Sequence, residues 1–335
     1  MSGAQGGGGG LPGPLRLPDP GELLNDESLD LLDFAGVLAL ARAFIDVDGV
    51  QQAAALAART AASDNSKLRA AGVLVTALVQ LAGKKPKDAL KSIQRLGESS
   101  DPDIAAEVFL VRGMAQHTRR KWADADANYQ LAMMLRNGAT SGLAAIHLGF
   151  LRAGYGEDEE AAQNFVAATS CGDPVVTAAA QLELALILDR NGRRDAAVER
   201  YRAAMRGPHT NVALHAAFNL AGLLRDGGDP EAAEESRDLL ERVHATGHPD
   251  YAPKAAVDLA VGRLEADRTD GVVELLTVGT TSPDPAIAAL AHLHLGSCLA
   301  DPVQAEQHLA IAQKTGPRAI KQAASQARKL RRAAR

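Results

Sequence analysis

A pattern of small and large apolar residues recurs every 36 residues through the middle of this 335-residue chain. In each copy a small residue is followed four positions later by a large one, and three positions after that by another small one. The clearest copies are Ala125, Tyr129 and Ala132, then Ala161, Phe165 and Ala168, then Ala197, Tyr201 and Ala204. Spacings of three and four place such residues on one face of an α-helix. A fixed period of this length is typical of arrays of helical hairpins.

Weaker copies extend the pattern toward both ends of the chain. The anchor of a copy, meaning its first small residue, is expected at Ala53, Ala89, Ala125, Ala161, Ala197 and Ala233, and then, after steps of 39 and 33 residues, at Val272 and Ala305. In the copy at Ala233 the large middle residue is replaced by Arg237. Twelve residues before the first six anchors lie further small residues, namely Ala41, Ala77, Gly113, Gly149, Ala185 and Ala221. Turn and breaker signals such as Asn191–Gly192 and Asp101–Pro102 separate these segments, so each copy predicts a first helix, a tight turn, a second helix and a breaker.

Small residues at fixed helical positions indicate helices that approach each other closely. A small residue on one helix leaves space that a larger residue of its neighbour fills. A single helical hairpin cannot bury its apolar face alone, so the hairpins have to stack on one another. We therefore expect an all-α protein, an α-solenoid of about eight helix-turn-helix repeats in residues 27–316.

The composition agrees with helices and excludes several other classes. Alanine supplies 66 of the 335 residues and aromatic residues only 3%, whereas sheets are rich in aromatic and β-branched residues. No apolar run reaches the roughly 20 residues that a membrane-spanning helix needs, so we expect no transmembrane segment. The net charge of −5 excludes a generally basic nucleic-acid coat.

The first 22 residues have no helical period. They contain the run Gly6–Gly10 and several prolines, but not the charged and apolar regions of a signal peptide. We expect residues 1–26 to form a disordered arm. The two cysteines, Cys171 and Cys298, are too few for a disulfide framework and favour a reducing, cytoplasmic compartment. Arginine outnumbers lysine by 26 to 10, which hints at a GC-rich bacterial genome.

The C-terminal residues 317–335 carry seven positive charges and no acidic residue. Apolar residues recur among them at helical spacing, which predicts a basic amphipathic helix. Such a helix would cap the last repeat, because the end of a repeat array needs a polar cover. Its cationic residues are a minor candidate contact for RNA, an anionic surface or an acidic partner; they include Arg328, Lys329, Arg331 and Arg332.

The repeat resembles the tetratricopeptide repeat family. One copy matches the family pattern at Phe109, Gly113, Ala125, Tyr129 and Ala132, and the next copy matches it at Leu148, Gly149, Ala161, Phe165 and Ala168. The Sel1-like repeat is similar and has the same period of 36 residues. The resemblance covers roughly residues 28–316, and it implies a right-handed superhelix whose first helices line a concave, partner-binding groove.

The resemblance also indicates which residues would line that groove, since they are read from the first helix of each copy. They form an apolar floor with scattered polar groups, which suits an extended peptide or an amphipathic helix. The candidates are Glu107, Met114, His147, Phe150, Glu183, His215, Phe218, Asn219 and Arg225. Packing between successive helices is the competing interpretation of the apolar candidates, and solvated surface is that of the polar ones.

The sequence shows no constellation of residues that an enzyme would need. The histidine pairs His292/His294 and His244/His248 lack a carboxylate or thiolate at metal-ligand spacing. The glycine run is not followed by the Lys-Ser of a phosphate-binding loop. We therefore expect no catalytic residue, no metal and no cofactor.

These observations predict a non-enzymatic scaffold or adaptor that binds a protein or peptide in its groove. The alternative is a peptide-sensing regulatory protein that acts with a separate DNA-binding chain, because residues 23–50 are too short and too acidic to hold a DNA-binding domain of their own. Exposed end repeats also leave a homo-oligomer open.

Overall fold

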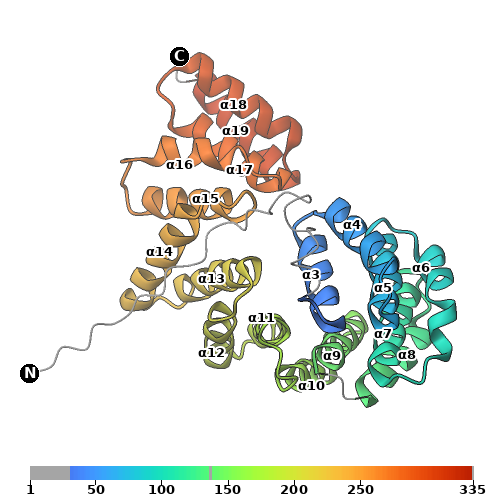
Figure 1. Ribbon diagram of the computed structural model, residues 1–335. Coiled ribbons are helices and arrows are strands. Elements are labelled where there is room, and N and C mark those ends of the chain that lie inside the picture. The colour runs from blue at the N-terminus through green and yellow to red at the C-terminus, as the bar shows by residue number, and fades with distance from the viewer. Residues whose placement is uncertain (1–30, 136–137, 334–335) are drawn as a thin grey trace, which may run out of the picture. The chain divides into compact units, whose positions relative to one another are not determined.

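The computed structural model of the protein describes residues 31–135 and 138–333. These residues form seventeen α-helices, one short 3₁₀ helix (Gln94–Glu98) and no strand (Figure 1). The described chain is therefore all-α, as the repeat predicts. The expected disordered arm, residues 1–26, lies outside the described residues.

Along the chain the helices follow one another as eight pairs, each with a first and a second helix, and one last helix comes after them. The first helices of the hairpins are α3 (Phe34–Asp46), α5 (Ser66–Ala82), α7 (Pro102–Thr118), α9 (Gly138–Gly154), α11 (Pro174–Arg190), α13 (Thr210–Arg225), α15 (Tyr251–Glu265) and α17 (Pro285–Cys298). The second helices are α4 (Val50–Ala61), α6 (Pro86–Ser92), α8 (Trp122–Met134), α10 (Asp158–Thr169), α12 (Arg194–Met205), α14 (Pro230–Ala245), α16 (Val272–Gly279) and α18 (Pro302–Thr315). The last helix is α19 (Arg318–Ala333).

Contacts divide the described residues into two compact units, an N-terminal unit of residues 31–187 and a C-terminal unit of residues 188–333. In the N-terminal unit, α3, α5 and α7 each pack against the second helix of their own hairpin and against the next first helix. In Figure 1 the second helices α6, α8 and α10 lie along the outer edge of this unit. In the C-terminal unit α13 and α15 make the same two kinds of contact. This is the packing of a helical repeat array.

Local signals set where the helices begin and where the hairpins turn. The carboxylate of Asp101 accepts hydrogen bonds from the backbone N–H groups at the start of α7, at 2.9 and 3.3 Å, and Pro102 takes the first helical position, where no N–H is needed. Between the two helices of a hairpin one residue adopts the left-handed backbone conformation. It recurs every 36 residues, at Asp48, Lys84, Arg120, Gly156, Gly192 and Gly228. The period in the sequence is thus also a period in the backbone.

The small residues of the repeat make room for large ones, as expected. A Cβ atom on Gly113 of α7 would overlap Cε1 of Tyr129 on α8. A Cβ atom on Gly149 of α9 would lie 2.6 Å from Cε1 of Phe165 on α10. Both rings are fully or almost fully buried. Glycine is therefore required for this close packing of first and second helices.

The sixth hairpin corrects the predicted register. The anchor expected at Ala233 is exposed, whereas Ser236 and Leu240 are buried with the spacing that an anchor and its large partner have. The hydroxyl of Ser236 donates a hydrogen bond to the backbone carbonyl of Ala221 at 2.6 Å. The shift of three residues therefore begins within α14, and Val272 follows Ser236 by the regular 36 residues. The three extra residues are accommodated by an additional, largely exposed turn at the start of α14.

The last helix, α19, covers the end of the C-terminal unit. It packs on α17 and α18. Its Ala324 is fully buried in a cluster with Leu309 and Ala312 of α18, and Ile320 packs against the same cluster. The predicted C-terminal capping helix is thus confirmed.

Candidate functional site

Glu107, a predicted groove residue, is buried in a polar bridge between first helices of the N-terminal unit. Its carboxylate accepts hydrogen bonds from Nη2 of Arg42 on α3 at 2.5 Å and from the hydroxyl of Thr140 on α9 at 2.6 Å. Arg42 thus reaches past the intervening first helix, α5, to a residue on α7. Side chains of alternate first helices can meet only on the side of the unit where the first helices converge. The bridge therefore marks the inner side of this unit. Glu107 itself is only 2% exposed and holds the helices together.

Phe150 of α9 occupies the same repeat position as Arg42, because the two residues are three periods apart. Met114 of α7 occupies this position as well, two periods after Arg42. Met114 is half-buried and packs against two core clusters, whereas the side chain of Phe150 is 40% exposed. Of these two predicted apolar groove residues, Phe150 therefore offers an accessible surface and Met114 serves mainly in packing.

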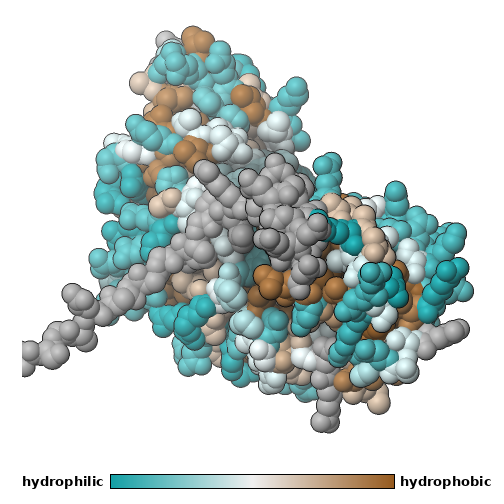
Figure 2. All heavy atoms as spheres, viewed as in Figure 1, coloured by the Kyte–Doolittle hydropathy of each residue, from teal (hydrophilic) through white to brown (hydrophobic). Residues whose placement is uncertain are grey.

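Several large apolar side chains of the described residues are exposed. On the face shown in Figure 2, brown apolar residues form small groups among teal hydrophilic ones. Val166 on the second helix α10 is 50% exposed, which is more than Phe150. Phe150 is thus distinguished by its place on a first helix, and Val166 provides a matched comparison on a second helix.

His147 belongs to a row of rings that supports Phe150. Its imidazole stacks on the ring of Tyr129 with centroids 5.4 Å apart and an interplanar angle of 10°. The ring of Phe150 lies edge-on to it, with centroids 6.4 Å apart. Burial lowers the pKa of His147 to about 4, so the imidazole is neutral at pH 7. His147 therefore acts as a rigid packing residue behind the exposed ring.

Glu183 of α11 follows His147 by one period and is half-buried. Burial raises the pKa of its carboxyl group to about 7. Among the described residues this carboxyl group makes no hydrogen bond or ion pair. A carboxyl group that changes its charge near neutral pH is a candidate for binding a donor or cation of a partner.

Two predicted groove residues of the C-terminal unit contact their own or a neighbouring helix, and a third is half-buried. The ring of His215 on α13 lies against that of Tyr251 on α15, with centroids 5.8 Å apart, and burial together with the charge of Lys254 lowers the pKa of His215. Nδ2 of Asn219 donates to the backbone carbonyl of His215 at 3.0 Å. Phe218 is half-buried. Packing within the unit accounts for these positions.

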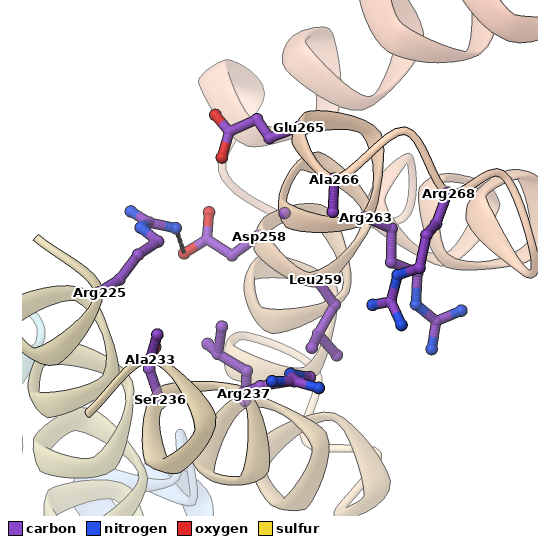
Figure 3. Close-up of a pocket in the computed structure, with 12 residues that line it drawn as sticks. Arg225, Ala233, Ser236, Arg237, Asp258, Leu259, Arg263, Glu265, Ala266 and Arg268 are labelled. Atoms are coloured by element: carbon purple, nitrogen blue, oxygen red, sulfur yellow. Dashed lines mark ion pairs between the residues drawn. The ribbon is translucent and has the colours of Figure 1, made fainter. Parts of the chain in front are cut away.

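Arg225, the last predicted groove residue, lines a cavity of about 400 Å³ that α13, α14 and α15 bound (Figure 3). Its Nη1 lies 3.9 Å from Oδ2 of Asp258. Burial raises the pKa of Asp258, although the charge of Arg225 opposes this shift. Three more arginines, Arg237, Arg263 and Arg268, also line the cavity. Sequence reasoning missed this site, and the one signal for it was Arg237 at the position where the predicted register, before its correction, expects a large apolar residue.

The arginines of the basic helix α19 bind the last hairpin. Nη2 of Arg328 and Nη2 of Arg332 lie 2.6 and 2.8 Å from Oε1 of Glu306 on α18. These hydrogen bonds lower the pKa of Glu306 to about 2. Arg331 donates to the backbone carbonyl that follows α17 at 2.6 Å, whereas Lys329 is exposed. Three of the four predicted cationic residues thus attach the cap to its neighbours.

A histidine pair that the sequence did not indicate lies within the last hairpin. Nδ1 of His292 on α17 is 2.8 Å from Nδ1 of His308 on α18, so one ring donates and the other accepts. Burial lowers the pKa of both imidazoles, and the charge of His308 lowers that of His292 further. Both rings are therefore held in the neutral form near pH 7.

Other chemistry-bearing residues of the described chain stand apart from one another. Cys171 and Cys298 are free thiols. Residues 31–135 and 138–333 contain no group of three side chains that could hold a metal ion. Among the same residues no helix is long and apolar enough to cross a membrane.

Stacked hairpins with small residues opposite large ones define the class of protein, a helical-repeat protein. No family model and no curated protein matches the sequence. Solved structures with a similar fold include the apo form of RapI, with a TM-score of 0.60 and 11% identity over 84% of this chain and 85% of that one. A Sel1 repeat protein from Oxalobacter formigenes is similar with a TM-score of 0.51 and 17% identity over 94% of this chain and 95% of that one.

A third similar structure is a signal transduction ATPase with numerous domains (STAND) protein with a tetratricopeptide repeat sensor, from Pyrococcus horikoshii. Its TM-score is 0.62 at 12% identity, over 93% of this chain and 53% of that one. The chain therefore spans about half the length of this relative. Together these structures show that the chain has the fold of tetratricopeptide and Sel1-like repeat proteins.

Proposed function

We propose that this protein is a non-enzymatic scaffold that binds a protein or peptide segment on the inner side of its N-terminal unit. The observation that carries the proposal is the exposed ring of Phe150 at the repeat position where Arg42 marks the inner side. A ring that is held by neighbouring rings is a good anchor for apolar side chains of a partner, because little conformational freedom is lost on binding. Glu183 on the following first helix adds a carboxyl group for a polar contact.

The helical-repeat fold supports this proposal. Stacked hairpins present a long surface built from equivalent positions of successive helices, and such surfaces bind extended peptides or amphipathic helices. The free thiols Cys171 and Cys298 agree with the reducing, cytoplasmic compartment in which we place the protein.

Affinity capture from the native cell tests the proposal with two matched variants. Phe150→Ala should reduce recovery of the bound partner about tenfold, as expected for a central apolar anchor. Val166→Ala removes an exposed apolar side chain from a second helix and should leave recovery unchanged. Equal recovery with both variants would contradict binding on the inner side.

A second candidate is a peptide-sensing regulatory protein that acts with a separate DNA-binding chain. Similarity in fold to the tetratricopeptide repeat sensor of the STAND protein favours it. DNA binding measured across a range of salt concentrations tests this role, because direct binding to phosphates weakens steeply with salt. The chain alone should not retain DNA, and salt-dependent retention by the chain alone would contradict the need for a second chain.

A further inference from the structure

Asp126, Arg152 and Glu157 form an ion-pair cluster where the third and fourth hairpins meet. Nη2 of Arg152 lies 2.8 Å from Oδ2 of Asp126, and Nη1 lies 3.2 Å from Oε2 of Glu157. Asp126 directly follows the anchor Ala125 in α8. Arg152 lies near the end of α9, and Glu157 lies just after the hairpin turn. One guanidinium group is thus balanced by two carboxylates.

The first of these positions recurs in α14. The buried anchor of that helix is Ser236, and Arg237 directly follows it. Arg237 therefore occupies the position that Asp126 has in α8. Because α8 packs on α9 as α14 packs on α15, the residue after the anchor faces an equivalent junction in both places.

The other two positions recur at the end of α15. The backbone N–H of Arg268 donates to the carbonyl of Arg263 at 2.9 Å, as the N–H of Glu157 does to the carbonyl of Arg152 at 3.0 Å. In both turns the preceding residue has a left-handed backbone, with φ of 54° and 78° respectively. Arg263 is therefore equivalent to Arg152, and Arg268 is equivalent to Glu157.

Both carboxylates of the first cluster are thus replaced by arginines in the second. Arg237, Arg263 and Arg268, here called the arginine trio, stand where an acid, an arginine and an acid stand between α8 and α9. Within the described residues the guanidinium groups of Arg237 and Arg268 make no ion pair or hydrogen bond. Arg263 lies 3.9 Å from the exposed carboxylate of Asp270 and donates to its backbone carbonyl at 2.7 Å. Three guanidinium groups therefore have little internal counter-charge.

The arginine trio lines the cavity of about 400 Å³. Figure 3 shows the three guanidinium groups on one side of this cavity, beyond Leu259. On the other side Asp258 faces Arg225, and Glu265 points away from the trio. The two acidic residues of the lining therefore do not neutralise the trio, and the lining as a whole has four arginines against two acids.

We propose that this cavity binds a small molecule that carries a phosphate group or several carboxylates. Guanidinium groups bind these oxyanions through paired N–H donors, and three of them with few internal partners suit more than one negative charge. The volume lies in the range of small-molecule sites. Leu240 and Leu259 supply apolar surface for the rest of the ligand. This site belongs to the C-terminal unit and Phe150 to the N-terminal unit, so this proposal does not rest on the proposed function.

Titration calorimetry of the full-length protein with pyrophosphate and with citrate, at low ionic strength, tests the proposal. The double variant Arg237→Asp with Arg268→Glu rebuilds the acid–arginine–acid arrangement that the chain already contains between α8 and α9. It should keep its circular dichroism spectrum and melting temperature, and bind the anion at least about tenfold more weakly. The control, Lys321→Asp with Lys329→Glu, makes the same change in net charge at exposed positions of α19 and should bind like the original protein.

The two probes distinguish the source of the charge. Binding of pyrophosphate alone supports a phosphate-bearing ligand, and binding of citrate alone supports a polycarboxylate. Failure of both to bind would overturn the proposal, as would equal binding by R237D/R268E or an equal loss in the control. Heparin is titrated in the same way as a polymeric anion. Binding of heparin without binding of pyrophosphate or citrate would also overturn the proposal, because a polymer of this kind binds a charged surface and does not fit a cavity of this size.

Discussion

The guanidinium group of Arg42 lies 2.5 Å from the carboxylate of Glu107, 65 residues further along the chain. The two residues belong to α3 and α7, which are separated by a complete hairpin. A bond between alternate first helices opposes separation of the helices on the inner side of the N-terminal unit. The arrangement of this side therefore depends on a long-range ion pair as well as on contacts between neighbouring repeats.

Glu107→Ala should destabilise the N-terminal unit strongly, because Arg42 and the hydroxyl of Thr140 lose the carboxylate that accepts their hydrogen bonds. Removing one member of a buried ion pair costs about 3 kcal/mol. Thermal unfolding followed by circular dichroism measures the effect. Asp124→Ala removes an exposed ion pair with Lys121 and should cost only about 0 to 1 kcal/mol. Equal melting temperatures of the two variants would contradict a structural role for the bridge.

Gly149→Ala should destabilise the protein, because the new Cβ atom meets the ring of Phe165 at 2.6 Å. Overpacking of this kind costs about 1 to 3 kcal/mol. Gly222→Ala is the matched control in another first helix, where a Cβ atom meets nothing within 4 Å. That change should stabilise the helix by roughly 0.5 to 1 kcal/mol. The two melting temperatures should therefore move in opposite directions, and a shift of both in one direction would contradict the packing.

Glu183 should make the stability of the N-terminal unit depend on pH. Its pKa is about 7 in the folded protein, whereas the ordinary value for a glutamate is 4.5, so between these values the folded protein binds more protons than the unfolded chain. Stability is then greatest at low pH and falls as the pH rises toward 7. Glu183→Gln should raise stability by on the order of 1 to 3 kcal/mol at about pH 8, and much less at about pH 5. Glu159→Gln, the same change at an exposed position, should leave the melting temperature unchanged at both pH values. If Glu183→Gln raised stability equally at both pH values, the raised pKa of Glu183 would be refuted.

The pair of His292 and His308 should destabilise the C-terminal unit in acid. Burial lowers both pKa values below 6.5, so below that pH the unfolded chain binds protons that the folded protein does not. The contribution of these two neutral imidazoles to the free energy of unfolding is therefore present above about pH 6.5 and is lost as the pH falls. His308→Gln keeps a polar side chain but removes one titrating group, and melting curves between about pH 7 and about pH 5 should show a smaller loss than in the original protein. An unchanged pH dependence would argue against this pair as its source.

Ending the chain at Gly316 should expose the apolar side chains of Leu309 and Ala312, which α19 covers. The shortened protein should melt at a lower temperature and self-associate, because an uncapped repeat presents its apolar face to solvent. Light scattering and thermal unfolding together measure these effects. Lys329→Ala, an exposed change within α19, should affect neither. A shortened chain that is unaltered in both measurements would show that α19 is not a cap.

The hairpins and their close contacts were predictable because they depend on residues near each other in the chain. Gly113 and Tyr129 lie within one repeat, and their sizes alone indicate that one fills the space left by the other. The error at Ala233 has a physical cause as well. The helix α14 still begins at the position that the period predicts, 36 residues after the start of α12, and the three inserted residues lengthen it by an exposed first turn. Only the burial of Ser236 shows which residues of α14 face inward.

The site was predictable only in part, since the first helices were identified but the state of each side chain was not. The position of Phe150 on a first helix follows from the period, whereas its exposure depends on how the rings of His147 and Tyr129 stack around it. The raised pKa of Glu183 depends on burial by residues from other helices. Neither property can be read from one helix.

The order of residues along the chain is enough to specify helical hairpins, their number and the contacts between adjacent helices, because each of these involves short separations that recur with the period. Packing in three dimensions alone establishes the bond between Arg42 and Glu107, and it alone brings Arg237 beside the turn that holds Arg263 and Arg268. These relationships join different repeats, so they depend on how helices stack. The period that reveals the hairpins carries no information about such pairings, since a repeat describes what its copies share and these residues are where the copies differ.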